Sequence, residues 1–306
     1  MADPWIRSLL FVPGHRLEWM VKAPRYGADA LILDLEDAVA EDRREAAREA
    51  VREAVALLAA APPAVFVRVN GWGGGALVRD VLAAVAPGLD GVMLGKVAGP
   101  ADVVALDRLL GELEIERGLA GGAIEIFPLV ESAAGIHAAY DVCRASARVR
   151  RLSGGLIGNP GGDVYGSVGL RGRADRLEGL HVGAKANLDA RAAGVEQIYG
   201  SVTGAPIDDL EAIRALAERA RDLGATGALA IHPSHVAVLN EAFAVPAEEI
   251  EAAKGVMRAI DAAIRRGDGS TRHEGRMLTR AHARKSLDLL ARAERFGQET
   301  GEYPRP

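Results

Sequence analysis

The feature that most constrains the fold is a regular alternation of two kinds of segment. Apolar, β-rich runs alternate with Ala-, Arg- and Glu-rich stretches such as residues 41–60 and 208–224, whose spacing and composition predict helices. Eight apolar runs predict strands; they begin at Ser8, Ala30, Ala64, Gly91, Ala123, Arg151, Val195 and Gly227. Because several of these runs are apolar almost throughout, they favour a parallel sheet covered by helices on both faces.

Eight strand–helix units over about 235 residues match the size of a TIM (β/α)8 barrel, which we therefore predict for residues 1–245. The main alternative is a doubly wound open sheet. That architecture usually has fewer units, and the first apolar run here is not followed by the G-x-G-x-x-G turn of its dinucleotide-binding members. The sequence therefore favours the barrel.

Two segments depart from the alternating pattern. Residues 246–306 contain two helical stretches, 247–266 and 281–297, joined by a polar segment that we interpret as a hinge, so we predict a C-terminal helical extension or lid. The segment from about Pro160 to Gly183 is rich in glycine and arginine and shows no clear period. We interpret it as a long loop that covers a functional region.

Composition excludes several classes of function. The chain has 306 residues, 49% of them hydrophobic, and a formal net charge of -5, which gives no electrostatic case for binding nucleic acid or an anionic membrane. No apolar run is long enough to span a bilayer, and the apolar stretch near the first residue is too short for a signal peptide. The single cysteine, Cys143, cannot form an internal disulfide. We expect a cytoplasmic protein that acts on a small molecule.

Polar residues gather where the predicted strands end. The list is Asp34, Glu36, Asp37, Arg68, Asn70, Lys96, Glu131, Ser132, Asn159, Asp163, Tyr199, Ser201 and His232. In a TIM barrel the carboxyl ends of all strands form one face, and active sites lie on that face. The sequence therefore predicts a polar pocket there, with the segment LILDLEDAV supplying one side of it.

The residue types predict a magnesium site. Glu131 and Asp163 follow neighbouring strands, and Mg²⁺ typically takes one or two carboxylates from a protein. No cluster of cysteine and histidine favours zinc. A hard cation beside Arg68 would stabilise negative charge on a carboxylate, enolate or carbonyl oxygen, which indicates carbon–carbon bond cleavage or formation next to a carbonyl.

Three further residues have predicted roles in this site. Glu36 and Asp37 are candidates for holding metal-bound water or for transferring a proton, and the latter role needs a pKa raised towards neutrality. Lys96 either binds an anionic group of the substrate or is a solvated strand end.

Each of these residues has a purely structural alternative. Glu131 could cap the helix expected from Ala133, and Asp163 could occupy a glycine-rich turn. Asp37 could cap a helix after the second strand. His232 is as consistent with a hydrogen-bonded structural histidine as with a catalytic one.

The motifs together resemble a known family. RSLLFVPG, LILDLEDAV, FVRVN, LGKV, PLVESAAG and AIHPSHVAVLNEAF occur in this order. They resemble the citrate lyase beta-subunit-like proteins of the HpcH/HpaI aldolase and citrate lyase family. The resemblance implies a TIM barrel that binds Mg²⁺ and cleaves or condenses 3-hydroxyacyl-coenzyme A thioesters such as citryl-, malyl- or citramalyl-CoA. It also implies a homo-oligomer, a trimer or a multiple of one, with the C-terminal segment near a neighbour's site.

Carried over motif by motif, the resemblance makes Arg68 the arginine of R-V-N, Glu131 and Asp163 the metal ligands, and Glu36 and Asp37 the acidic pair. The chain also departs from the family's usual sequence motifs at three places. Gly95 stands where L-P-K-V is common, Gly158 to Gly162 lengthen the turn before Asp163, and Thr279 stands where a lid aspartate is usual.

Three functions therefore remain open at this stage. The leading hypothesis is an Mg²⁺-dependent carbon–carbon lyase for a small hydroxyacyl-CoA thioester. The second is an aldolase that acts on free 2-oxo or hydroxy acids without CoA. The third, which Thr279 encourages, is a catalytically weak citrate-lyase-like subunit that keeps the barrel and the metal but has lost turnover.

Overall fold

The computed structural model describes residues 5–59, 63–154, 162–173, 175 and 177–304. Its contacts divide the chain into two compact units, Ile6–Phe243 and Ala244–Pro306, the second of which also takes in Trp5. No helix among the described residues is long and apolar enough to cross a membrane.

The first unit is a TIM-barrel-like fold, as predicted. Its eight strands are β1 (Ser8–Pro13), β2 (Ala30–Asp34), β3 (Ala64–Val69), β4 (Gly91–Leu94), β5 (Glu125–Pro128), β6 (Arg151–Ser153), β7 (Gln197–Ser201) and β8 (Gly227–Ala230). They pair in parallel in the order β5-β4-β3-β2-β1-β8-β7-β6. Two isolated parallel bridges, Ile126 with Val149 and Leu129 with Ser153, join the two ends of the sheet. All eight predicted strands are confirmed.

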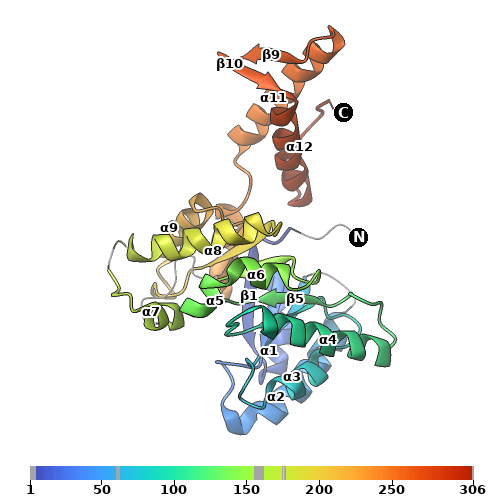
Figure 1. The fold of residues 1–306 in the computed structure, drawn as a ribbon, viewed down its shortest axis with the longest axis vertical. Coiled ribbons are helices and arrows are strands. Elements are labelled where there is room, and N and C mark those ends of the chain that lie inside the picture. The colour runs from blue at the N-terminus through green and yellow to red at the C-terminus, as the bar shows by residue number, and fades with distance from the viewer. Residues whose placement is uncertain (1–4, 60–62, 155–161, 174, 176, 305–306) are drawn as a thin grey trace. The chain divides into compact units, whose positions relative to one another are not determined.

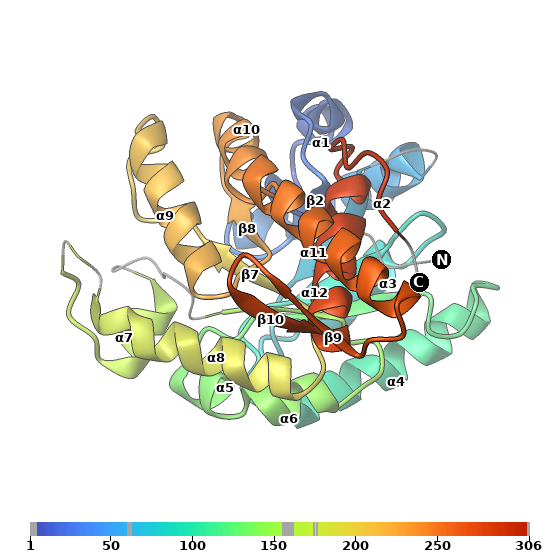
Figure 2. The same cartoon turned by 90° about the horizontal axis from the view of Figure 1, so that it is seen from above.

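Helices surround these strands (Figures 1 and 2). The longer ones are α2 (Arg44–Leu58), α3 (Leu77–Ala84), α4 (Pro100–Glu116), α8 (Leu180–Ala192), α9 (Leu210–Asp222) and α10 (Pro233–Ala242). The shorter ones are α1 (Leu17–Lys22), α5 (Ala133–His137), α6 (Ala139–Arg144), α7 (Asp163–Val168) and the 3₁₀ turns η1 (Ala23–Tyr26), η2 (Glu41–Arg43) and η3 (Leu177–Gly179).

Alternate residues of most strands enter two different cores. In β2, Leu31 and Leu33 join the large cluster beneath the helices, whereas Ile32 joins a second cluster with Phe66 and Phe127. Every residue of β2 is buried, which explains why the strand is apolar throughout and not only at every second position. The barrel interior is therefore a packed core, and space for a ligand is left only at the strand ends.

The segment that we interpreted as a long loop is largely helical, so that prediction was wrong. Within residues 160–183, the described part contains α7, η3 and the start of α8. Helix α7 has only six residues and α8 has a weak apolar stripe, and for this reason no helical period was visible in the sequence. Residues 160, 161, 174 and 176 lie outside the described residues.

The second unit contains α11 (Ala247–Arg265), β9 (Ser270–His273), β10 (Arg276–Thr279) and α12 (Arg280–Arg295). Both predicted helices are present, with Ile250, Met257 and Leu290 in their shared core. The prediction of a polar hinge was wrong, because residues 270–279 form an antiparallel hairpin. Glu274 and Gly275 have positive φ at its turn, which suits a two-residue hairpin connection.

Candidate active site

The arginine of the R-V-N motif is held by a carboxylate on the neighbouring strand. Arg68 on β3 is in register with Asp34 on β2, and its Nε and Nη2 each donate to one Asp34 oxygen over 2.7 Å. The ring of Phe11 lies 4.8 Å from the guanidinium carbon. Burial works against the charged form, but the hydrogen bonds and charge of Asp34 raise the pKa of Arg68 above its ordinary value. Arg68 is therefore a fixed positive charge at the strand ends.

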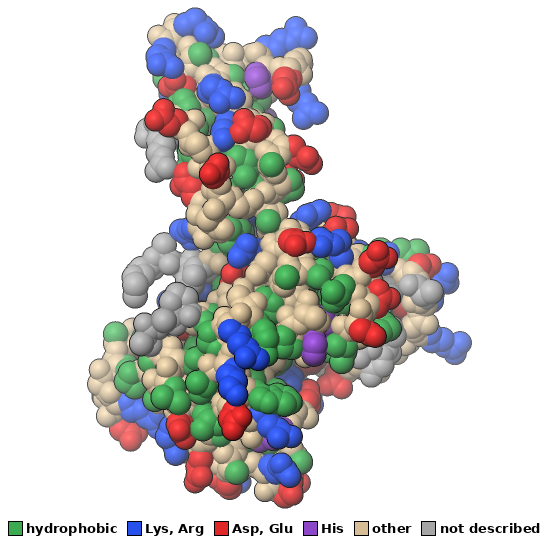
Figure 3. Space-filling model, turned by 180° about the vertical axis from the view of Figure 1, so that it is seen from behind, with side chains coloured by type: hydrophobic (Ala, Val, Ile, Leu, Met, Phe, Trp, Pro, Cys, Tyr) green, Lys and Arg blue, Asp and Glu red, His purple; other side chains and the backbone are tan. Residues whose placement is uncertain are grey.

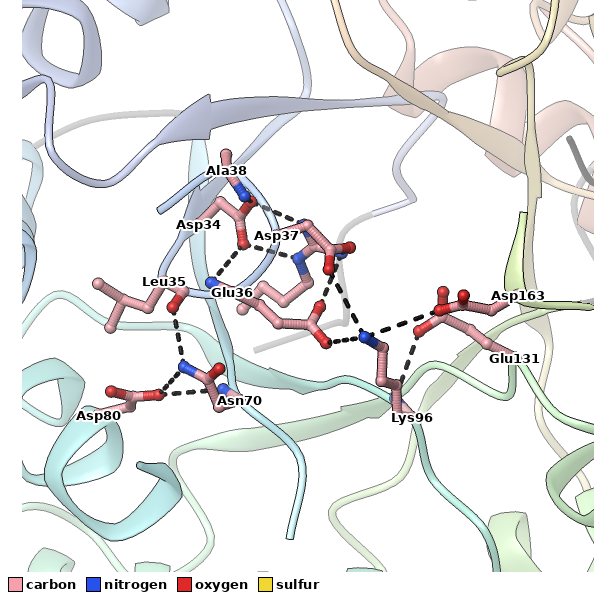
Figure 4. Close-up of polar contacts among 11 residues, drawn as sticks. Asp34, Leu35, Glu36, Asp37, Ala38, Asn70, Asp80, Lys96, Glu131 and Asp163 are labelled. Atoms are coloured by element: carbon pink, nitrogen blue, oxygen red, sulfur yellow. Dashed lines mark hydrogen bonds and ion pairs between the residues drawn. The ribbon is translucent and has the colours of Figure 1, made fainter. Parts of the chain in front are cut away.

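Asp34 also fixes the turn that follows its own strand. Its two carboxylate oxygens accept from the backbone N–H of Glu36 and of Ala38, at 3.0 and 3.1 Å. Because Asp34 binds both Arg68 and this turn, the segment LEDA has a defined position relative to the arginine (Figure 4).

Asn70 secures the same turn from the other side. Its side-chain amide donates to the Leu35 carbonyl over 2.8 Å and to Asp80 over 2.7 Å, and Arg48 donates to the second oxygen of Asp80. Asn70 is buried and does not line the main cavity. Its position at a strand end thus serves to hold the backbone.

Glu36 and Asp37 both approach the arginine but differ in exposure. Oε2 of Glu36 lies 2.9 Å from Nη1 of Arg68, as an ion pair without hydrogen-bond geometry, while Oδ2 of Asp37 accepts from the same nitrogen over 3.0 Å. The Glu36 side chain is only 6% exposed and the Asp37 side chain 58%. Burial, aided by the charge of Asp37, raises the pKa of Glu36 even though Arg68 and Lys96 oppose the shift.

Lys96 connects this group with the two predicted metal ligands. Its ammonium lies 3.2 Å from Glu36, 3.6 Å from Asp37 and 3.7 Å from Asp163, and its backbone N–H donates to Glu131 over 3.3 Å (Figure 4). The structure therefore brings together all six residues that the sequence analysis assigned to the site.

The pKa of Glu131 lies well above the ordinary value of a glutamate. Burial, together with the negative charge of Glu36 and Asp163 and against the opposing charge of Arg68, raises the pKa of Glu131 to about 7. It does not cap the next helix, since the hydroxyl of Ser132 accepts from the Gly135 N–H there. The structural alternative for Glu131 is therefore excluded.

These carboxylates fit a magnesium ion bound mainly by solvent and substrate. In the described ranges, no three side chains among His, Cys, Asp and Glu form a group that could hold a metal on their own. Mg²⁺ usually needs only one or two carboxylates and keeps several waters. Glu131 and Asp163 repel each other electrostatically, and this excess of negative charge is what a divalent cation would neutralise.

A cavity of about 630 Å³ opens above these side chains. Asp34, Asp37, Arg68, Lys96, Glu131 and Asp163, which follow or end β2 to β6, line its charged side. The side chains from the regions of β1, β7 and β8 are uncharged at pH 7, and they are Phe11, Pro13, Tyr199, Ser201, Thr203, Leu229 and Ile231. The cavity is thus asymmetric, with the charged side chains on one side only.

Some residues were misjudged or missed in the sequence. Asp34 was noticed as a strand-end residue but not assigned to the site, because its role depends on its register with the arginine of the next motif, which appears only once the two strands are paired. Phe11 carried no signal beyond its place in an apolar run. His232 caps α10, because its ring nitrogen accepts from the Ser234 N–H. It therefore has the structural role that the sequence analysis left open beside a catalytic one. Asn159 lies outside the described residues.

Comparison with known proteins agrees with the resemblance. The pattern of the HpcH/HpaI aldolase/citrate lyase family matches residues 7–233. The chain belongs to this family. An L-malyl-CoA/beta-methylmalyl-CoA lyase of Cereibacter sphaeroides is 33% identical over 304 residues, covering 94% of each chain. A (3S)-malyl-CoA thioesterase of the same species is 31% identical over 297 residues, covering 96% of each.

A solved structure of a family member has the same architecture. The CitE protein of Mycobacterium tuberculosis, crystallised with magnesium, acetoacetate and coenzyme A, superimposes with a TM-score of 0.72 at 28% identity. The match covers 96% of this chain and 100% of that one. It therefore extends beyond the barrel into the C-terminal segment.

Proposed function

We propose that this family member is an Mg²⁺-dependent carbon–carbon lyase that cleaves or forms a small 3-hydroxyacyl-CoA thioester. The observation that carries the proposal is the meeting of Glu131 and Asp163 with Lys96 at the strand ends, in the same cavity as Arg68. The lyase named among the relatives and the magnesium and coenzyme A in the CitE crystal support the substrate class and the cofactor.

The roles follow from position and charge. Glu131 and Asp163 are proposed to hold Mg²⁺, which when bound supplies positive charge to a developing enolate oxygen. Arg68, oriented by Asp34, is proposed to bind a carboxylate or carbonyl oxygen of the substrate, and Lys96 an anionic group. Both side chains line the cavity.

The proton-transferring group is proposed to be Asp37. It lines the cavity and is 58% exposed, whereas Glu36 lies buried beneath Arg68 and Lys96 and lines a neighbouring hollow instead. Glu36 therefore acts in this proposal by positioning the two cations. Thr279, which has no ionisable side chain at pH 7, cannot take the role of a lid carboxylate.

A product assay tests the function. Purified protein with Mg²⁺ is expected to convert malyl-, citramalyl- or citryl-CoA into an acyl-CoA and an oxo acid, and EDTA is expected to abolish turnover. Free oxo and hydroxy acids are assayed in parallel, and a thiol reagent detects free CoA. Turnover of the free acids alone would favour the aldolase, release of free CoA without an oxo acid would mean hydrolysis, and no turnover of any substrate would favour the catalytically weak subunit.

We further propose a homo-oligomer, a trimer or a multiple of one, working in the cytoplasm. Large apolar side chains are exposed on α3 and α4, among them Val78, Leu82 and Ile115, the last at 77%. Figure 3 shows one face of the molecule, on which acidic, basic and hydrophobic side chains are all exposed. Size-exclusion chromatography with multi-angle light scattering at micromolar concentration is expected to give about three times 32.1 kDa, or a multiple of that mass, and a monomer would contradict the proposal.

A further inference from the structure

Lys96 has an unusual backbone conformation for a residue with a long side chain. Its φ is +55°, and among the described residues only Glu274, in the hairpin turn, shares a positive φ without being glycine. The left-handed region is unfavourable for such residues and persists where surrounding contacts impose it. Here the contacts are those of the ammonium with three carboxylates.

The residue before Lys96 makes room for one of these contacts. A Cβ at Gly95 would lie 3.1 to 3.2 Å from the carboxylate atoms of Glu36, closer than most side chains tolerate. Because Gly95 has no Cβ, Glu36 can lie over the backbone and reach the Lys96 ammonium at 3.2 Å. The unfavourable backbone conformation of Lys96 and the missing Cβ of Gly95 therefore both help to place the Lys96 ammonium among the carboxylates.

The two cations of the site differ in their freedom to move. Arg68 is held by two hydrogen bonds to buried Asp34 and is 10% exposed. The Lys96 side chain is 48% exposed, and its flexible stem can swing without any change in the backbone. Lys96 is therefore the one of the two that a ligand can displace.

We infer that Lys96 is the built-in counter-ion of the metal-free site: its ammonium competes with the divalent cation for Asp163, and entry of the metal frees it from that carboxylate towards the anionic substrate. The inference rests on the proposed function, since it takes Glu131 and Asp163 as the metal ligands. It predicts an order of binding, with the metal first and the substrate anion second, because the ammonium is paired with carboxylates until the metal replaces it.

The test is the affinity of the protein for Mg²⁺ alone, measured by isothermal titration calorimetry without substrate. Removing a positive charge that lies within 4 Å of Asp163 is expected to tighten Mg²⁺ binding about tenfold in Lys96→Met. Lys96→Arg, which keeps the charge, is expected to bind Mg²⁺ much as the wild type does. Lys22→Met, an exposed lysine on α1, is the matched control and is expected to leave the affinity unchanged.

A second readout does not depend on calorimetry. In EDTA, Lys96→Met is expected to melt at a lower temperature than the wild type, because three carboxylates have lost their counter-ion, and Mg²⁺ is expected to raise its melting temperature by more than it raises that of the wild type. Unchanged or weaker Mg²⁺ binding in Lys96→Met, beside normal binding in the wild type, would overturn the inference and leave the proposed function standing. If neither the wild type nor Lys96→Met bound Mg²⁺, the inference and the proposed function would both be wrong.

Discussion

Arg68→Met is expected to lower kcat/KM by about 10³-fold, the upper range for losing one well-placed donor to a developing negative charge. The loss has two causes in the structure. The substrate oxygen loses its fixed cation, and Asp34 and Glu36 are left buried beside an uncharged side chain. Breaking a buried ion pair in this way costs roughly 3–5 kcal/mol of stability. Steady-state kinetics and thermal unfolding should therefore both change.

Arg68→Lys separates these two effects. A lysine keeps the positive charge near Asp34 but cannot make both guanidinium hydrogen bonds, so most of the stability is expected to return while kcat/KM stays about 10²-fold below the wild type. If Arg68→Lys were as active as the wild type, oriented binding by the guanidinium would have no part in the reaction.

Glu131→Gln is expected to abolish Mg²⁺-dependent turnover and, with the metal removed, to make the protein more stable at pH 8. Folding raises the pKa of Glu131 from 4.5 to about 7. A carboxyl with a raised pKa costs no stability below pH 4.5, costs progressively more as pH rises to 7, and keeps that full cost above pH 7. A shift of this size corresponds to roughly 3 kcal/mol, an order-of-magnitude value that glutamine would recover.

Urea unfolding in EDTA at pH 5 and pH 8 measures this difference. The stability advantage of Glu131→Gln over the wild type is expected to be small at pH 5 and to grow by pH 8. Glu41→Gln, at a side chain that is 90% exposed, is the matched control and should show no such trend. A Glu131→Gln protein that is less stable than the wild type at both pH values would contradict the raised pKa of Glu131, and one that still turns over with Mg²⁺ would contradict the metal assignment.

The barrel could be predicted because its physical requirements are visible in the sequence. Parallel strands buried on both faces must be apolar throughout, and polar residues can then follow only at their ends. This logic led to Asp37, Lys96, Glu131 and Asp163, which the structure places at one cavity, and to Glu36, which is buried beside them.

What could not be predicted depends on contacts between distant segments. Asp34 and Asn70 are both polar residues at strand ends, yet the first orients Arg68 and the second only ties loops together. Nothing in their local sequence distinguishes these roles, because each depends on register with another strand. The hairpin at Ser270–Thr279 was missed for a similar reason, since a short polar strand gains its stability from its partner strand and from α11.

The asymmetry of the cavity bears on how such an enzyme could be redesigned. The charged groups come from residues 34–163, and the uncharged side chains opposite them, apart from Phe11 and Pro13, come from residues 199–231. Reactivity and substrate fit are thus encoded in largely separate stretches of the gene. Libraries confined to Ser201, Thr203 and Ile231 would vary the shape of accepted ligands while every charged side chain of the cavity stays in place.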